Sequence, residues 1–271
     1  MRLVAPLAAL GCLFGLLAGA GCYQVPVTGR AAISMVSDEE VAKQSLAAFA
    51  EMKKKYRVSR DPVLNERVQR VGERLARAAF WDVPNADWEF VLFDSPQINA
   101  FAMAGGKVGV FTGLFKIVQN DDQLASVLAH EIGHVAARHV NERLSQQMAI
   151  QGGGVLVGLA TGGGGTLSSA AVMEAYGLST GLTAVSFDRK KEAEADHIGI
   201  MYMARAGYDP EQAIKVLERL EEQSAGQPAA SSWLSTHPST PDRIVQLEDL
   251  LPQAQKVYAQ SARTQTPTPV N

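Results

Sequence analysis

The stretch LASVLAHEIGHV, residues 124–135, decides how the rest of the chain is interpreted. Its apolar residues recur at intervals of three and four, which predicts a helix from Leu124 to about Ile150 with one buried face. Residues four apart lie one above the other on a helix, so His130 and His134 present two imidazoles to one point. Because zinc sites use imidazoles arranged in this way, we predict that both histidines bind a metal ion.

Glu131 adds a catalytic group to this ligand pair. It lies one step round the helix from His130, so its carboxylate comes beside the metal without binding it. There it can take a proton from a water whose pKa the metal has lowered, which makes Glu131 the candidate catalytic base. With 5 His and 28 Asp+Glu in 271 residues, chance would give this pattern only about 0.01 times. Two histidines that lie four apart by accident are therefore a poor alternative.

The run Glu192-Ala-Glu-Ala-Asp196 supplies a carboxylate for the third zinc ligand. Glu192 and Asp196 share a helical face, so we expect Glu192 to bind the metal and Asp196 to accept the spare ring N–H of a ligating histidine. Gly199 continues this face and allows a close helix–helix approach. Glu194 points to the other side and is expected in solvent. The alternative for the run is an ordinary charged helix surface.

The other three histidines carry weaker signals. His139 is one residue short of the position at which a third histidine on the metal helix binds zinc in metzincins, so we expect a structural role or a contact with a ligand. His197 is also expected to be structural. His237 precedes Pro238 in a loop, where it is a fourth zinc ligand, a hydrogen-bond donor to the transition state, or a locally packed side chain.

Outward from the motif, the pattern predicts one α+β domain over residues 37–255 that is mostly helical. Two segments, 87–93 and 100–111, read as three short strands, so a small sheet comes before the metal helix. Helices are predicted at 37–56, from 61 onward, and at 124–150, 188–206, 209–223 and 241–250. The Gly-rich segment 151–166 is either a lid or a disordered connector, and residues 256–271 are expected to be a disordered tail.

The N-terminus is typical of an export signal. Arg2 precedes an apolar run that ends on small residues before Cys22. We expect residues 1–21 to be a lipoprotein signal peptide, Cys22 to carry lipid, and residues 22–36 to form a flexible tether. The alternatives are simple secretion and an uncleaved membrane helix, since an apolar run of about 18 residues is at the lower limit for spanning.

The composition excludes several classes of protein. The chain has 25 Lys+Arg against 28 Asp+Glu, and this net charge of -3 argues against a nucleic-acid binder. Hydrophobic residues make up 46% of the chain, which is normal for a globular protein and excludes wholesale disorder. Two cysteines, Cys12 and Cys22, cannot form a disulfide framework.

With these motifs together, the sequence resembles the gluzincin metallopeptidases of the family that contains the CAAX prenyl protease, HtpX and the Oma-type proteases. The resemblance rests on residues 130–134 and 192–199, on the segment 99–107 before the metal helix, and on segments 206–210 and 235–238. It is nearest to the bacterial periplasmic BepA-like lipoprotein peptidases, without the tetratricopeptide domain that these often carry. A zincin-type metalloprotease fold is the expectation.

The resemblance also implies a site. One zinc ion would be bound by His130, His134 and Glu192, with Glu131 as general base, and His237 would close the site in a latent state. An edge strand would hold the substrate backbone in extended form, and its residues would be Asn99, Ala100, Phe101, Ala102 and Met103. The alternative for this strand is a purely structural place in the core.

A function follows from the same resemblance. The enzyme would hydrolyse unfolded or misassembled cell-envelope proteins, and a lipid anchor would hold it on the periplasmic side of a bacterial membrane, with the outer membrane favoured. Outer-membrane assembly machinery is a possible partner, and nucleic acid is not. The alternative is a chaperone or assembly factor for outer-membrane proteins whose protease activity is latent.

Overall fold

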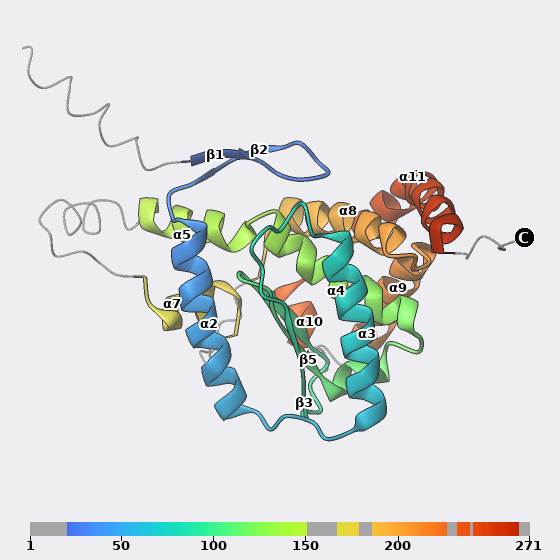
Figure 1. The fold of residues 1–271 in the computed structure, drawn as a ribbon, viewed down its shortest axis with the longest axis horizontal. Coiled ribbons are helices and arrows are strands. Elements are labelled where there is room, and N and C mark those ends of the chain that lie inside the picture. The colour runs from blue at the N-terminus through green and yellow to red at the C-terminus, as the bar shows by residue number, and fades with distance from the viewer. Residues whose placement is uncertain (1–20, 151–166, 179–185, 227–231, 239–240, 266–271) are drawn as a thin grey trace, which may run out of the picture.

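The computed structural model describes residues 21–150, 167–178, 186–226, 232–238 and 241–265 (Figure 1). Within these ranges helices surround small sheets, which confirms the predicted α+β class. The predictions for residues 1–20 and for the Gly-rich segment 151–166 lie outside the described residues. No helix in the described part of the chain combines the length and the apolar character that crossing a bilayer requires.

The elements follow the chain in this order: β1 (Gly21–Gln24), β2 (Ala31–Ser34), α2 (Asp38–Lys55), α3 (Pro62–Ala78), β3 (Glu89–Phe93), β4 (Ala100–Met103), β5 (Lys107–Phe111), the 3-10 helix η3 (Thr112–Lys116), α4 (Asp121–Ala136), α5 (His139–Ile150), α7 (Ser169–Ala175), α8 (Arg189–Arg205), α9 (Glu211–Gly226), α10 (Ser232–Thr236) and α11 (Pro241–Gln265).

Two of the predicted helix starts, at residues 37 and 61, are confirmed by their caps. The Ser37 side chain accepts a hydrogen bond from the Glu40 N–H at 3.2 Å, and Asp61 accepts one from the Leu64 N–H at 3.0 Å. Each bond satisfies a backbone donor that the first turn of a helix leaves without an intrahelical partner. Both helices then bury apolar stripes against the sheet and its neighbours.

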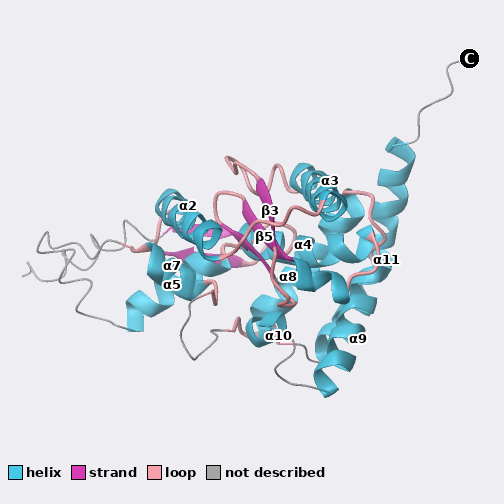
Figure 2. Ribbon diagram, turned by 90° about the horizontal axis from the view of Figure 1, so that it is seen from below, coloured by secondary structure: helices cyan, strands magenta, loops and turns pink. Residues whose placement is uncertain are grey.

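A three-stranded sheet separates two apolar clusters. Its order is β3-β5-β4, with β5 parallel to β3 and antiparallel to β4. Side chains alternate along a strand, so Leu92 and Val110 pack with α3 and α4, whereas Phe93 and Phe111 pack toward α2. Figure 2 shows the strands between α2 on one side and α3 and α4 on the other. In this order β4 is an edge strand, as predicted.

Helices α4 and α8 touch through their backbones, and this contact builds the centre of the domain. A β-carbon on Gly133 would lie 2.8 Å from the carbonyl oxygen of Ala195, and one on Gly199 would lie 3.0 Å from the backbone nitrogen of His130. A side chain at residue 133 would therefore force the backbones apart, and one at residue 199 would be tighter than almost all real contacts. The close approach predicted from Gly199 is therefore confirmed.

The single long helix predicted over residues 124–150 is wrong, because the chain turns between α4 and α5. Arg138 has a φ of 54°, in the left-handed region that interrupts a right-handed helix. Its guanidinium pairs with Asp38 at 2.6 Å and packs over the ring of Tyr23. These contacts come from segments about a hundred residues away in the sequence. They stabilise a turn that the local sequence does not predict.

The segment expected to be a flexible tether instead forms the β1–β2 hairpin. Val25 is buried, and the Tyr23 hydroxyl donates to the carbonyl of Ala137 at 2.8 Å. The Met35 N–H donates to the hydroxyl of Ser145 at 2.8 Å. The hairpin therefore packs on the helical body, and Figure 1 shows it along one rim of the molecule.

The predicted disordered tail is likewise wrong for residues 256–265. Helix α11 continues through Pro252 to Gln265. The Ser261 hydroxyl donates to the carbonyl of Ala204 at 2.7 Å, which ties the extension to α8. Residues 266–271 lie outside the described part of the chain.

Candidate metal centre and active site

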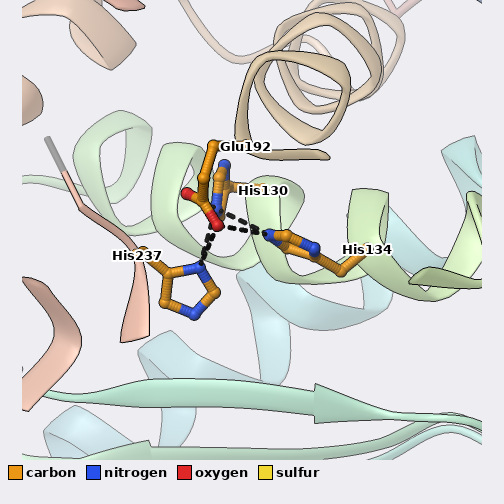
Figure 3. Close-up of side chains that lie close together, drawn as sticks. All are labelled: His130, His134, Glu192 and His237. Carbon is orange, nitrogen blue, oxygen red and sulfur yellow. Dashed lines mark hydrogen bonds and ion pairs between the residues drawn. The ribbon is translucent and has the colours of Figure 1, made fainter. Parts of the chain in front are cut away.

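Four buried side chains from three places in the chain converge on one point (Figure 3). His130 and His134 come from successive turns of α4, Glu192 from the first turn of α8, and His237 directly after α10. One ligand atom from each lies within 4.8 Å of the others. The helices place the three ligands predicted from the motifs together, and the loop adds the fourth.

Five distances within this group are close to those around a tetrahedral ion. Nε2 of His130 lies 3.1 Å from Nε2 of His134, 3.3 Å from Nδ1 of His237 and 3.4 Å from Oε2 of Glu192. Oε1 of Glu192 lies 3.5 Å from Nε2 of His134 and 3.0 Å from Nδ1 of His237. Ligands placed 2.0–2.1 Å from a tetrahedral zinc stand about 3.4 Å apart, so the spacing suits this ion.

The state of the donor atoms also suits a cation. Oε2 of Glu192 is buried and has no hydrogen bond among the described residues, although it lies 3.0 Å from the guanidinium of Arg243. Burial raises the pKa of Glu192, but the charge of His237 and hydrogen bonds from the other histidines outweigh it and hold that pKa well below its usual value. Burial lowers the pKa of His134 and so favours the neutral, metal-binding imidazole.

Asp196 holds the ring of His130, as predicted. Its Oδ1 lies 2.8 Å from Nδ1 of His130, which leaves Nε2 of that ring to face the other ligands. Arg243 binds both oxygens of Asp196 at 2.7 and 2.8 Å, a bidentate geometry that fixes the carboxylate plane. Burial raises the pKa of Asp196, but the charge of Arg243 outweighs burial and the net shift is downward.

Glu131 is held by a residue that the sequence did not single out. The indole Nε1–H of Trp233 donates to Oε1 of Glu131 at 2.7 Å, and both side chains are buried. Nε2 of His237 approaches the same oxygen at 3.4 Å. The carboxylate predicted to act as the base therefore lies beside the ligand group and is oriented from α10. A tryptophan in a loop-bordered short helix carries no sequence pattern that would have revealed this role.

Glu194 was expected in solvent, and this expectation is wrong. Its carboxylate is buried, accepts from the Nε of Arg30 at 3.0 and 2.8 Å, and lies 3.0 Å from Nε2 of His139. Nδ1 of His139 in turn lies 2.8 Å from Nδ1 of His134. The β1–β2 hairpin thus reaches the metal group through Glu194 and His139. His139 contacts a predicted ligand, in agreement with the expectation, and His197 is half-buried outside the group.

The predicted substrate strand borders the same site. Asn99 accepts from the Phe111 N–H at 3.1 Å, which fixes the pairing of β4 with β5. By the alternation of an antiparallel pair, the backbone groups of Ala100 and Ala102 point away from β5, toward the side of β4 on which the described residues place no further strand. All four residues of β4 are buried in this structure. The Trp233 N–H donates to the carbonyl of Ile98 at 3.0 Å, so α10 lies at the beginning of this edge.

Known proteins resemble most of this chain. Residues 62–251 match the family described as peptidase family M48. The chain is 34% identical to the mitochondrial metalloendopeptidase OMA1 of Schizosaccharomyces pombe over 90% of this chain and 72% of that protein. It is 33% identical to the OMA1 protein of Saccharomyces cerevisiae over 73% of this chain and 59% of that protein. It is 32% identical to the beta-barrel assembly-enhancing protease of Escherichia coli K12 over 74% of this chain and 42% of that protein. The family match and the buried ligand group support the predicted cofactor, zinc.

Proposed function

Because the chain belongs to peptidase family M48 and is a metallopeptidase, we propose that it is a zinc endopeptidase attached to a membrane by its N-terminus. The proposed substrates are unfolded or misassembled proteins of the bacterial cell envelope. The observation that carries the proposal is the group of His130, His134, Glu192 and His237, buried beside the carboxylate of Glu131.

The residues divide the chemistry between them. His130, His134 and Glu192 would hold the zinc ion. When bound, zinc lowers the pKa of water toward neutrality and polarises the peptide carbonyl. Glu131 takes a proton from the attacking water and returns it to the leaving amine, while Trp233 keeps its carboxylate in place through the 2.7 Å hydrogen bond.

We propose that the substrate binds along the edge of β4 that faces away from β5. An extended peptide that adds to this edge would pair with the backbone groups of Ala100 and Ala102, so binding would depend little on the substrate sequence. Asn99, Phe101 and Met103 contribute their backbone to the other side of the strand, toward β5. Since only an extended chain can pair in this way, unfolded segments are favoured over folded domains.

His237 gives the resting enzyme a closed site. A catalytic zinc keeps one position open, whereas four side chains converge here and His237 is close enough to take the fourth position. We therefore propose that His237 is the fourth ligand of a latent state and leaves during turnover. A latent protease could bind chains without cleaving them. A chaperone or assembly role is therefore the second candidate function.

Two observations support the proposed location in the cell envelope. The N-terminal sequence has an apolar run that ends at Gly21 and Cys22. A relative in Escherichia coli is a beta-barrel assembly-enhancing protease. Lipid attachment at Cys22, which is exposed, is therefore proposed, with the outer membrane as the favoured site.

Proteolysis of casein tests the function. The chain lacking residues 1–21, with Cys22→Ser, should contain about one zinc ion and cleave casein, and a chelator should stop cleavage. Glu131→Gln should keep zinc and lose about 10²- to 10⁴-fold in turnover. Glu66→Gln, an exposed glutamate on α3, is the matched control and should behave as the parent. Unchanged casein cleavage by Glu131→Gln would refute the assignment, and full rescue of a deletion strain by that variant would favour the chaperone.

A further inference from the structure

We propose that the outer face of the β1–β2 hairpin lies flat on a lipid bilayer, so that the membrane holds the enzyme directly instead of through a flexible tether. The inference rests on the proposed N-terminal attachment. The inference specifies which surface of the domain contacts the membrane and how the domain is oriented relative to the bilayer.

The outer face of the hairpin carries no charged side chain. Cys22 pairs with Ile33 across the two strands, and directly opposite residues project to the same face. Cys22 is exposed and Ile33 is 62% exposed. The next pair on this face is Gln24 with Ala31, and both are exposed. Met35, two residues beyond Ile33, is 39% exposed. A bilayer contact needs an exposed, mostly apolar face of this kind.

The inner face of the hairpin fixes this orientation. The Arg30 guanidinium bridges Glu194 and Glu142, each at 2.7 Å, and the Tyr23 hydroxyl donates to Glu142 at 3.0 Å. Val25 is buried among the residues of the main core. Since one face is bound to the body by these contacts, the face with Cys22 must point outward.

The chain leaves no slack between the membrane and the domain. A free segment over residues 22–36 would reach up to about 50 Å at ~3.4 Å per residue. The structure uses this segment for the hairpin, and β1 already begins at Gly21. After cleavage, a lipid on Cys22 would attach to the first remaining residue of the strand, and an uncleaved apolar segment would join the strand one residue earlier. Either anchor brings the bilayer to this face, which is why a bilayer is the proposed occupant.

A second exposed apolar feature lies beside the hairpin. Phe80 and Trp81 stack edge to face at 5.0 Å, and Trp81 is 87% exposed. Trp81 lines one surface pocket of about 540 Å³ together with Gln24 and Pro26 of the hairpin. Tryptophan prefers the headgroup level of membranes, so this pair would give the domain a second point of contact.

The charged residues of this pocket do not oppose such a contact. Asp82 is 3.1 Å from Arg205, and Arg138 is 2.6 Å from Asp38. Pairing reduces the cost of bringing them near the membrane surface, because each charge keeps a partner there.

The proposal restricts where substrates can meet the enzyme. Arg30 of the hairpin contacts Glu194, Glu194 contacts His139, and His139 contacts His134. The metal group is therefore separated from the membrane-facing hairpin by only a few side chains. An enzyme held in this way acts on chains at the membrane surface and has little access to chains far from it.

The experiment places a fluorescent label on the proposed contact face. After lipidation of Cys22 and removal of Cys12 with the signal peptide, the chain has no free thiol, so Ile33→Cys can be labelled alone with an NBD dye. The matched control is Val63→Cys, since Val63 is 64% exposed in the first turn of α3. That turn lies at the opposite edge of the molecule (Figure 1). Both lipoproteins are reconstituted into vesicles of phosphatidylethanolamine and phosphatidylglycerol.

The label at residue 33 should emit at shorter wavelength on vesicles and be quenched by doxyl-labelled lipid. The label at residue 63 should be quenched by aqueous iodide and not by the lipid. Met35→Cys gives a second position that should behave as residue 33. If the protein floats with the vesicles while iodide quenches residues 33 and 63 equally, the flat orientation is overturned and the anchor stands. If the protein does not float with the vesicles, the anchor itself is refuted and the orientation with it.

Discussion

Gly133→Ala tests whether the contact between α4 and α8 sets the geometry of the metal site. A β-carbon at residue 133 would lie 2.8 Å from the Ala195 carbonyl oxygen and 3.3 Å from its α-carbon. An ordinary contact needs about 3.4 Å, so the helices must separate by about 0.6 Å. The obstacle is backbone, which cannot rotate away as a side chain does.

This displacement acts on the ligands directly. Ala195 lies between Glu192 and Asp196 on α8, and Gly133 precedes His134 on α4. Metal–ligand distances tolerate only about ±0.2 Å, so a separation of about 0.6 Å moves Glu192 out of range of an ion held by the histidines. We expect zinc affinity to fall at least 10-fold, the lower end of the range for changes in residues that orient ligands.

The same substitution destabilises the fold by overpacking. The expected cost is about 2 kcal/mol, which corresponds to a decrease in Tm of roughly 4–8 °C for a domain of this size. Thermal unfolding of the zinc-free protein measures this part, and competition with a chromophoric chelator measures zinc affinity. Both measurements are needed, because a general loss of stability could imitate a loss of zinc.

Gly72→Ala on α3 is the matched control. Its β-carbon would lie 2.4 Å from the ring of Phe90, which overpacks the contact between α3 and β3 without touching a ligand. It should lower the Tm of the zinc-free protein and keep the zinc affinity of the parent. If folded Gly133→Ala binds zinc as tightly as Gly72→Ala, the helix contact does not set the site and the reasoning is refuted.

Three further substitutions address single contacts. Asp196→Asn should weaken zinc binding about 10- to 100-fold in the chelator assay, because His130 loses its charged partner at 2.8 Å. Burial raises the pKa of Glu194, but hydrogen bonds from His139 and Arg30 outweigh burial and lower that pKa from 4.5 to about 2. The ionised carboxylate therefore stabilises the fold fully above pH 4.5, and this stabilisation is lost as the pH falls toward 2. Acid unfolding of zinc-free Glu194→Gln should therefore be less steep in that interval than that of the parent. His237→Ala should remove one nitrogen from the coordination of cobalt-substituted enzyme and raise casein turnover. Unchanged spectra together with unchanged turnover would exclude the latent state.

The parts of the site that the sequence predicted depend on short-range geometry. His130 and His134 are four apart on one helix, and Glu192 and Asp196 are four apart on another, so each pair shares a face whatever the rest of the fold does. Gly199 follows the same spacing and marks the face that meets α4. The class of fold followed from the same periodicity, together with three short strands before the metal helix.

The parts that the sequence did not predict depend on contacts across the chain. Glu194 is buried because Arg30, 164 residues away, brings two hydrogen bonds to it. Arg138 adopts a left-handed conformation where Asp38 and Tyr23 hold its side chain. The composition of residues 22–36 suggested a flexible tether. Short polar segments with Pro and Gly occur in hairpins as well as in linkers, so composition alone does not distinguish the two. No local pattern contains these partners.

In the proposed mode of binding, a substrate on β4 and the closed position of His237 would compete for one backbone group, the Ile98 carbonyl. On the side of β4 away from β5, the carbonyls of Ala100 and Ala102 point the same way, because they alternate with the groups bonded to β5. The Ile98 carbonyl lies just before the strand and continues this alternation, since the Asn99 carbonyl accepts from the Phe111 N–H. The Ile98 carbonyl already accepts from the Trp233 N–H, and the His237 N–H donates to the Trp233 carbonyl at 2.8 Å. A peptide that pairs along the whole edge would need the Ile98 carbonyl for itself. Its binding would therefore release α10, and with it both the fourth ligand and the 2.7 Å hydrogen bond that holds Glu131. Opening of the site would then be driven by the substrate, which suits an enzyme that must stay inactive until an extended chain reaches it.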